Sequence, residues 1–199
     1  NKVLNRLLVD LNDMFEIGLA ELEGGNLRNA IPREAFAVIL FRSSTEKEIT
    51  AFIGGFEKTM QKEFGKVEPN FSIEIESMDV PNIRIPGGYV SRLLHAIHAA
   101  PHGVENMSTD VPGLTETSTN MARVHASNGE VEILFLTRSS SDSRKMLLAR
   151  KIESAFRLMD AETIEHSGAY PGWIPNPDSE ILQVMKKGYE TQFGKTPKV

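Results

Sequence analysis

The stretch TETSTNMARVHASNGEVEILFLTR, residues 115–138, decides the fold. Apolar and polar residues alternate next to Ser127, Asn128 and Gly129 on either side, which is typical of strands with one side on a core. Asn-Gly between two such segments is a strong signal for a hairpin turn. The stretch therefore predicts two long antiparallel strands, over residues 115–126 and 130–138.

Helices flank this hairpin in the second half of the chain. Apolar spacing predicts one helix from about 88 to 100 and another from about 141 to 159, and the serine run before the second one is suited to capping its first turn. A short strand is predicted around 163–168. The second half thus has the order helix, strand, strand, helix, strand.

The first half shows the same order. An apolar stripe predicts a helix over residues 3–14, and strands are predicted over 16–23 and 35–41, the second of them apolar enough for a central strand buried on both faces. Thr45 and Glu48 form a capping-box pattern before a further helix, which ends near Phe64. Alternation over 71–78 predicts a strand with one wet face.

This repeated order predicts an α+β fold of ferredoxin-like αββαβ units, duplicated, with the helices on one face of an antiparallel sheet. A ferredoxin-like unit is βαββαβ, so each half lacks only its opening strand. That strand could lie upstream of Asn1 for the first half, and 71–78 could supply it for the second. Alternatively, each half is an ordinary sheet with helices on one face.

Domain boundaries follow from this pattern. We expect one half over residues 1–80, the other over 81–168, and a proline-rich boundary with a closing helix over 169–199. Three prolines within residues 170–177 exclude helix or central strand there. The chain opens on Asn1 without an initiating Met or a signal-peptide pattern, so we expect a fragment of a longer protein.

Composition excludes several classes of function. The 199 residues include 22 basic and 27 acidic side chains, so the formal charge of −5 gives no phosphate-binding surface and nucleic acid is not an expected partner. No apolar run reaches the roughly 18 residues that span a bilayer, and no membrane association is expected. The lack of cysteine excludes a thiolate nucleophile and fits the cytoplasm.

Three histidines have the spacing of possible metal ligands. His95, His98 and His102 stand at i, i+3 and i+7, but Pro101 interrupts the helix and no carboxylate accompanies them. Imidazoles near a helix C-terminus, interacting with its free carbonyls, are the more ordinary interpretation. No His-Glu-x-x-His, Gly-x-Ser-x-Gly or Walker pattern occurs, so no catalytic or metal-binding residue is predicted in this chain.

Two polar residues are better candidates for a binding site. Asn29 lies in a turn before a strand, and Arg138 ends the most apolar strand. Together an amide and a guanidinium suit an anion, because Arg offers a bidentate fork to a carboxylate. The alternative is that Asn29 makes local turn bonds and Arg138 pairs with a surface acid. Trp173, the single tryptophan, is either a hydrophobic plug or a ligand contact.

Several motifs in order along the chain resemble one family. They are Gly24 to Ala35 (GGNLRNAIPREA), Gly113 to Asn120 (GLTETSTN), Arg138-Ser139-x-x-Asp142-Ser143, and Tyr170-Pro171-Gly172-Trp173. Together they are similar to the lid region of bacterial aminoacyl-histidine (Xaa-His) dipeptidases, which are zinc exopeptidases.

The resemblance implies a two-part enzyme. Zinc in the full-length enzyme would be held by ligands outside this chain, and the fragment itself would bind none. The chain would be a ferredoxin-like lid and dimerisation domain that closes over a short peptide, with the catalytic domain of the same polypeptide and a possible second copy as partners.

The resemblance also suggests which residues meet the substrate. Asn29 and Arg138 match motif positions expected to hold the dipeptide carboxylate or its scissile carbonyl. Simpler lids of related peptidases would place the guanidinium at Arg42, which is the alternative to Arg138. Two other hypotheses remain: a stand-alone ferredoxin-like module that binds a small ligand or oligomerises, and a metalloenzyme that uses the three helix histidines.

Overall fold

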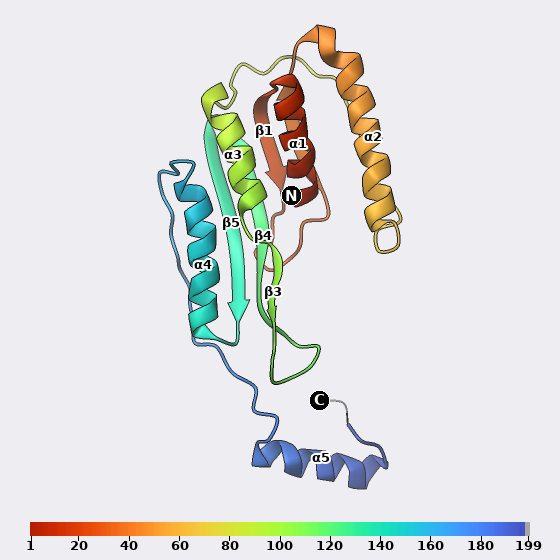
Figure 1. Cartoon of the computed structure of the whole chain (residues 1–199), viewed down its shortest axis with the longest axis vertical. Coiled ribbons are helices and arrows are strands. Elements are labelled where there is room, and N and C mark those ends of the chain that lie inside the picture. Colours follow the sequence, from red (N-terminus) through yellow and green to blue (C-terminus); the bar gives the residue numbers. More distant parts are fainter. Residues whose placement is uncertain (198–199) are drawn as a thin grey trace.

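The computed structural model describes residues 1–197, and its centre is a hairpin of two long strands within a five-stranded antiparallel sheet (Figure 1). Strands β4 (Thr115–Ser127) and β5 (Glu130–Ser139) pair along their whole length. Asn128 and Gly129 between them have φ angles of 55° and 84°, as a two-residue hairpin turn requires. The predicted hairpin is confirmed.

The other edge of β4 is shared by two shorter strands. Strand β1 (Gly18–Gly24) pairs with residues 124–126 of β4, and β3 (Gly103–Met107) pairs with residues 115–119. Strand β2 (Ala35–Leu40) adds to the outside of β1. The sheet therefore runs from β2 at one edge to β5 at the other. The sequence analysis did not predict β3.

The position of β2 corrects one expectation. The sequence predicted that residues 35–41 form a central strand, but β2 is an edge strand of the described sheet. Ala37 and Ile39 pack against the core, whereas the Phe36 side chain on the opposite face is 62% exposed. The apolar residues on that face are therefore not explained by packing within residues 1–197.

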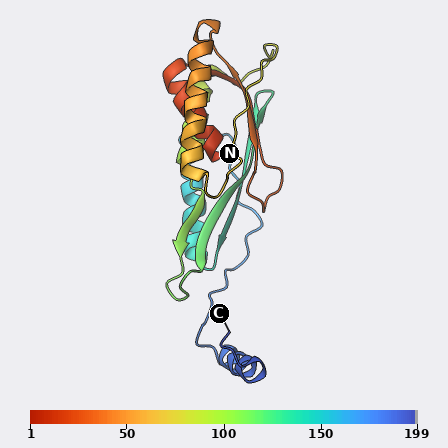
Figure 2. The same ribbon diagram turned by 90° about the vertical axis from the view of Figure 1, so that its right-hand side faces the viewer.

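Four helices cover one face of the sheet and leave the other face open (Figure 2). Helix α1 (Lys2–Phe15) packs against α2 (Glu46–Phe64) and α3 (Gly87–Ala99), and α3 packs against α4 (Asp142–Arg157). The helices and sheet enclose one hydrophobic core, whose most buried large side chains include Leu8, Leu19, Met60, Leu94, Ile97 and Met121. The prediction of an α+β fold with helices on an antiparallel sheet is confirmed.

The predicted capping box of α2 is not formed. A short 3-10 turn, η1 (Ser43–Thr45), precedes the helix, and the Thr45 hydroxyl donates to the Arg42 carbonyl at 2.8 Å instead of accepting from the first helical turn. Ser141, in contrast, caps α4 as expected, since its hydroxyl accepts from the Arg144 backbone N–H.

The strands predicted over 71–78 and 163–168 are absent from the described chain. Phe71 and Ile73 do pack against the core, but their backbone is tied to α2: the Phe71 carbonyl accepts from Gln61 at 3.2 Å, and the Ile73 N–H donates to Glu57 at 2.8 Å. Alternation shows only that one side of an extended segment is buried. A helix surface satisfies that pattern as well as a sheet does.

The C-terminal helix, α5, lies apart from the sheet in both views (Figures 1 and 2). Helix α5 (Glu180–Phe193) begins after Ser179, within the range 169–199 in which a closing helix was predicted. None of its residues is buried, and its apolar side chains are open to solvent: Ile181, Val184, Met185, Tyr189 and Phe193. The helix therefore offers an apolar face that residues 1–197 do not cover.

Two glycines should respond oppositely to an added methyl group. A Cβ on Gly55, within α2, would meet no atom within 4 Å, so Gly55→Ala should raise the free energy of unfolding by about 0.5–1 kcal/mol. Gly25 has φ +80°, and a Cβ there would lie 2.0 Å from the Ala122 carbonyl oxygen, so Gly25→Ala should lower it by more than about 1 kcal/mol. Urea titrations check both, and a destabilising Gly55→Ala would contradict the solvent-exposed position of that glycine.

Candidate functional site

Asn29 lies in the connection between β1 and β2, at the tip of a tight turn. The Ala30 N–H donates to the Leu27 carbonyl at 3.2 Å, which closes a β-turn with Arg28 and Asn29 in its centre. The Asn29 side chain is exposed. The connection also passes close to β4, because Gly25 packs against the Ala122 carbonyl. The predicted turn position of Asn29 is confirmed.

Arg138 lies near the end of β5, close to the part of β4 that holds this turn. It pairs with Ser118 of β4, and Asn120 lies two residues further along the same face. The Asn120 amide donates to the Ala30 carbonyl at 2.7 Å. Arg138 and the turn that carries Asn29 therefore approach the same region of the open face of the sheet.

Arg42 lies at the opposite end of β2 from the Asn29 turn. Strand β2 begins beside Gly24, where the turn-bearing connection leaves β1, and ends at Leu40, which pairs with Gly18. A strand of six residues spans about 20 Å, so this length separates Arg42 from the turn. The register of the sheet thus brings Arg138, and not Arg42, towards Asn29.

Trp173 belongs to a segment fixed beside the end of β5. The Gly172 N–H donates to Asp142 at 2.9 Å, and Lys145 bonds both Asp142 and the Tyr170 carbonyl. The Lys145 ammonium and the Gly172 N–H hold the pKa of the Asp142 carboxyl below its ordinary value. The Trp173 side chain is 79% exposed, so it is not a buried plug within the described chain. Its neighbour Gly172 is bonded to Asp142, close to the C-terminal end of β5.

The backbone at Gly172 shows that the segment carrying Trp173 lies close to the end of β5 that carries Arg138. A Cβ on Gly172 would lie 2.3 Å from the Ser140 carbonyl oxygen and 2.9 Å from that of Ser139. The segment therefore packs directly on the residues that follow Arg138. Only a glycine fits this approach without displacing the chain.

The three helix histidines do not converge. His95 Nδ1 contacts the Ser91 carbonyl at 2.8 Å within α3, whereas His102 Nδ1 accepts the Met121 N–H of β4 at 3.0 Å. Within residues 1–197, no group of three or more His, Cys, Asp or Glu side chains could hold a metal ion.

Lys2 satisfies the end of α3, the role that the sequence analysis gave to histidine. Its ammonium donates at 2.7–2.8 Å to three carbonyls there, those of Ile97, His98 and Ala100. A cation is favourable at a helix C-terminus because the unpaired carbonyls carry partial negative charge. The expectation that histidines fill this role was therefore wrong for these carbonyls.

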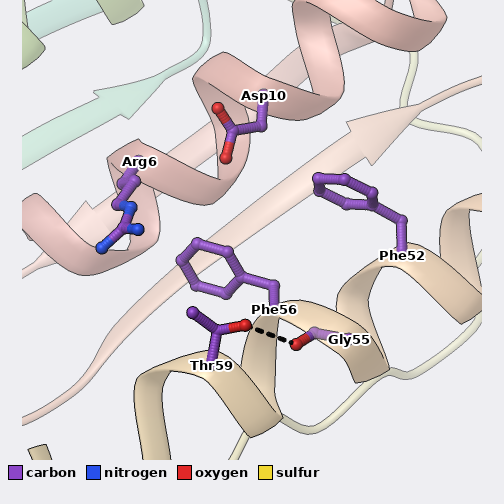
Figure 3. A pocket seen from close by; sticks show the side chains of 6 residues that line it. All are labelled: Arg6, Asp10, Phe52, Gly55, Phe56 and Thr59. Carbon is purple, nitrogen blue, oxygen red and sulfur yellow. Dashed lines mark hydrogen bonds between the residues drawn. The ribbon is translucent and has the colours of Figure 1, made fainter. Parts of the chain in front are cut away.

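A groove of about 320 Å³ lies between α1 and α2, and neither Asn29 nor Arg138 lines it (Figure 3). Phe52 and Phe56 form its apolar side, and Arg6 lies over the Phe56 ring at 5.7 Å from the centroid. The Arg6 guanidinium also makes two hydrogen bonds to Glu63, at 2.9 and 3.2 Å. Its charge is therefore already paired, and the groove is explained by the packing of the two helices.

The sequence analysis missed Asn120 and the clamp of Asp142 and Lys145 on residues 170–172. A signal for Asn120 exists: residues 115–120, TETSTN, are all polar, although they lie in a strand at the centre of the sheet. No local signal marks the clamp, because its two sides are about thirty residues apart.

The fold agrees with comparisons to known proteins. Residues 1–68, which comprise α1, β1, β2 and α2, match the family model of the peptidase dimerisation domain. The chain is 31% identical over 199 residues to the cytosol non-specific dipeptidase of Escherichia coli (strain K12). The crystal structure of aminoacylhistidine dipeptidase from Vibrio alginolyticus matches with a TM-score of 0.94 and 33% identity over 99% of this chain.

The comparisons also limit what the chain represents. It spans 41% of the E. coli protein and 40% of the V. alginolyticus chain. The resemblance to Xaa-His dipeptidases is confirmed: the chain is similar to one part of each of these two dipeptidases, and its residues 1–68 match the model of the peptidase dimerisation domain. Within residues 1–197, no helix is both long and apolar enough to cross a membrane.

His102 should make stability depend on pH. Packing of its Nδ1 edge against the sheet, and the nearby charge of Lys2, lower the pKa of His102. As the pH falls below about 6.5, the unfolded chain gains a proton on His102 that the folded chain does not bind, so the free energy of unfolding falls. His102→Asn keeps an acceptor for the Met121 N–H but cannot titrate.

Urea titrations at pH 7.5 and 5.5 check this prediction. The loss of stability between the two values should be smaller in His102→Asn than in the wild type. Equal losses of unfolding free energy in the two proteins would contradict the lowered pKa of His102.

Proposed function

We propose that this chain is the lid and dimerisation portion of a cytoplasmic, zinc-dependent dipeptidase that hydrolyses Xaa-His-type dipeptides. The observation that carries the proposal is that the turn carrying Asn29 is bonded to Asn120 of β4, two residues from the Ser118 that pairs with Arg138, in a chain similar along its whole length to two dipeptidases. The contribution of this chain is substrate anchoring.

The chemistry of the two residues suits the end of a peptide. Within residues 1–197, neither the Asn29 nor the Arg138 side chain has a hydrogen-bond partner, and both are exposed. The Arg138 guanidinium can bind the substrate carboxylate with two parallel hydrogen bonds. Asn29 can donate beside it, to the carboxylate or to the oxygen of the scissile carbonyl, where charge develops during hydrolysis. Trp173, fixed near Arg138, offers an aromatic wall to a substrate side chain.

In the proposed enzyme the zinc ligands would lie in the catalytic domain of the same polypeptide, as the similarity to Xaa-His dipeptidases implies. In such an enzyme the metal would supply the activated water for hydrolysis. The open face of this sheet would close over the dipeptide and exclude bulk water. The exposed apolar face of α5 would pack on the catalytic domain.

Arg138 and Arg42 provide a matched pair for a test. In the full-length protein that contains this chain, Arg138→Met should lower kcat/KM for alanyl-histidine about 10- to 100-fold, mainly through KM, because one charge-assisted anchor of about 1.5–3 kcal/mol is lost. Arg42→Met, which removes the same group at the far end of β2, should change it less than about twofold. A larger loss in Arg42→Met would reverse the assignment of the anchor.

A second copy of this chain is the expected partner at the β2 edge. Strand β2, AFAVIL, carries no charged residue and no proline, although its outer edge is unpaired within the described structure. Exposed edges usually carry a charge or a proline that prevents pairing with other chains. The match of residues 1–68 to a peptidase dimerisation domain supports a homodimer through this edge.

A charge on this edge should break the dimer. Phe36→Lys places an ammonium on β2, so the full-length protein should shift from dimer to monomer in sedimentation velocity experiments. Val131→Lys makes a similar change at an exposed position of β5, the other edge strand, and should leave the dimer intact. Dissociation by Val131→Lys alone would place the interface at β5.

A further inference from the structure

Two asparagines in the described chain have the same unusual hydrogen bonding. The Asn5 amide donates to the Leu94 carbonyl at 2.9 Å, and the Asn120 amide donates to the Ala30 carbonyl at 2.7 Å. Within residues 1–197, the Oδ1 atom of each is buried and has no hydrogen-bond partner. An unpaired buried acceptor costs stability, so the hydrogen bond that each amide N–H donates is the favourable polar interaction at these two sites.

The two asparagines hold different things. Asn5 joins α1 to α3, two helices that pack together through apolar side chains as well. Asn120 joins the central strand to a surface turn, and that turn carries Asn29. The same kind of amide-to-carbonyl hydrogen bond therefore joins two helices at Asn5 and attaches the turn of a candidate binding residue at Asn120.

We propose that Asn120 is a positioning residue, which holds the turn Leu27–Ala30 so that Asn29 is presented beside Arg138. This inference rests on the proposed substrate-anchoring function. Asn120 does not touch the substrate. It acts through the backbone of Ala30, the residue that follows Asn29.

The attachment of the turn supports this role. The connection from β1 to β2 is fixed to β4 at Gly25, which packs on the Ala122 carbonyl, and again at Ala30, which Asn120 holds. Between these two points the turn has a single internal hydrogen bond, from Ala30 to Leu27. Without the Asn120 donor, the part of the loop nearest Asn29 loses its attachment to the sheet.

The acceptor at Ala30 also explains why the residue is an asparagine. The carbonyl requires a donor, which fixes the orientation of the amide and leaves Oδ1 without a partner. Leucine has a similar volume and would remove the unpaired acceptor, but it cannot donate. Asn120→Leu therefore separates the positioning role from the filling of space.

The kinetic test is a double-mutant cycle in the full-length protein with alanyl-histidine as substrate. We expect Asn120→Leu to lower kcat/KM about tenfold, because small displacements of a positioned group are costly to catalysis. In an Asn29→Ala background, the same change should cause little further loss, since the group it positions is already gone. Asn5→Leu is the matched control and should leave kcat/KM within about twofold. If Asn120→Leu does not fold, Asn120→Ala, which also cannot donate, replaces it with the same expectations.

Hydrogen exchange on the same proteins is a second readout that does not depend on activity. Exchange at the amides of residues 26–31 should rise in Asn120→Leu and stay unchanged in Asn5→Leu. Losses of activity that multiply with Asn29→Ala, or that Asn5→Leu reproduces, would overturn the positioning role. If the wild type does not cleave the dipeptide, the proposed function fails, and unchanged loop exchange in Asn120→Leu would then overturn the positioning role as well.

Discussion

The pairing of β4 with three other strands is the constraint on which the rest of the structure depends. β4 is long enough for β1 and β3 to share one edge while β5 occupies the other. A bulge between Met121 and Arg123 inserts one residue, and both Met121 and Ala122 are fully buried. The bulge shifts the alternation by one residue, so that Thr117 and Thr119 before it and Val124 after it all face the helices.

The same bulge connects the fold to the candidate site. The carbonyl oxygen of the extra residue, Ala122, is the atom against which Gly25 packs, and Asn120, two residues earlier, bonds the Ala30 carbonyl. Bulges commonly redirect side chains next to binding sites. Here the bulge lies where the connection from β1 to β2 passes β4. The same bulge therefore sets which β4 side chains face the core and where the Asn29 turn is attached.

The sequence predicted the elements with strong local signals and missed those that depend on distant contacts. The β4–β5 hairpin and the helices follow from Asn-Gly and from apolar periodicity, which are local. Alternation over 71–78 was assigned to a strand, but its buried side rests on α2. The apolar pattern of β2 was assigned to a central strand, although β2 lies at an edge of the sheet. An apolar sequence shows that a strand can be buried on both faces, but it does not show which neighbours cover it.

The candidate site divides in the same way. The turn position of Asn29 and the strand-end position of Arg138 are local properties, and both were predicted. Their approach to one another depends on β1 pairing with β4, about one hundred residues away, and no local pattern reports that pairing. The register of the sheet also places Arg138 near the Asn29 turn and Arg42 at the far end of β2, two residues that the sequence alone left as alternatives.

The polar half of β4 accounts for the fixed position of Arg138. Hydroxyl pairs add a directional requirement to the strand register, beyond the one that the buried apolar face imposes. Thr117 bonds Ser139 at 2.8 Å and Thr119 bonds Thr137 at 3.0 Å, both between β4 and β5 and both beneath the helices. A shift of β5 by one residue would leave these buried hydroxyls unpaired and turn Arg138 towards the helices. The threonines therefore set the register that keeps the guanidinium on the open face, where the proposed substrate carboxylate would bind.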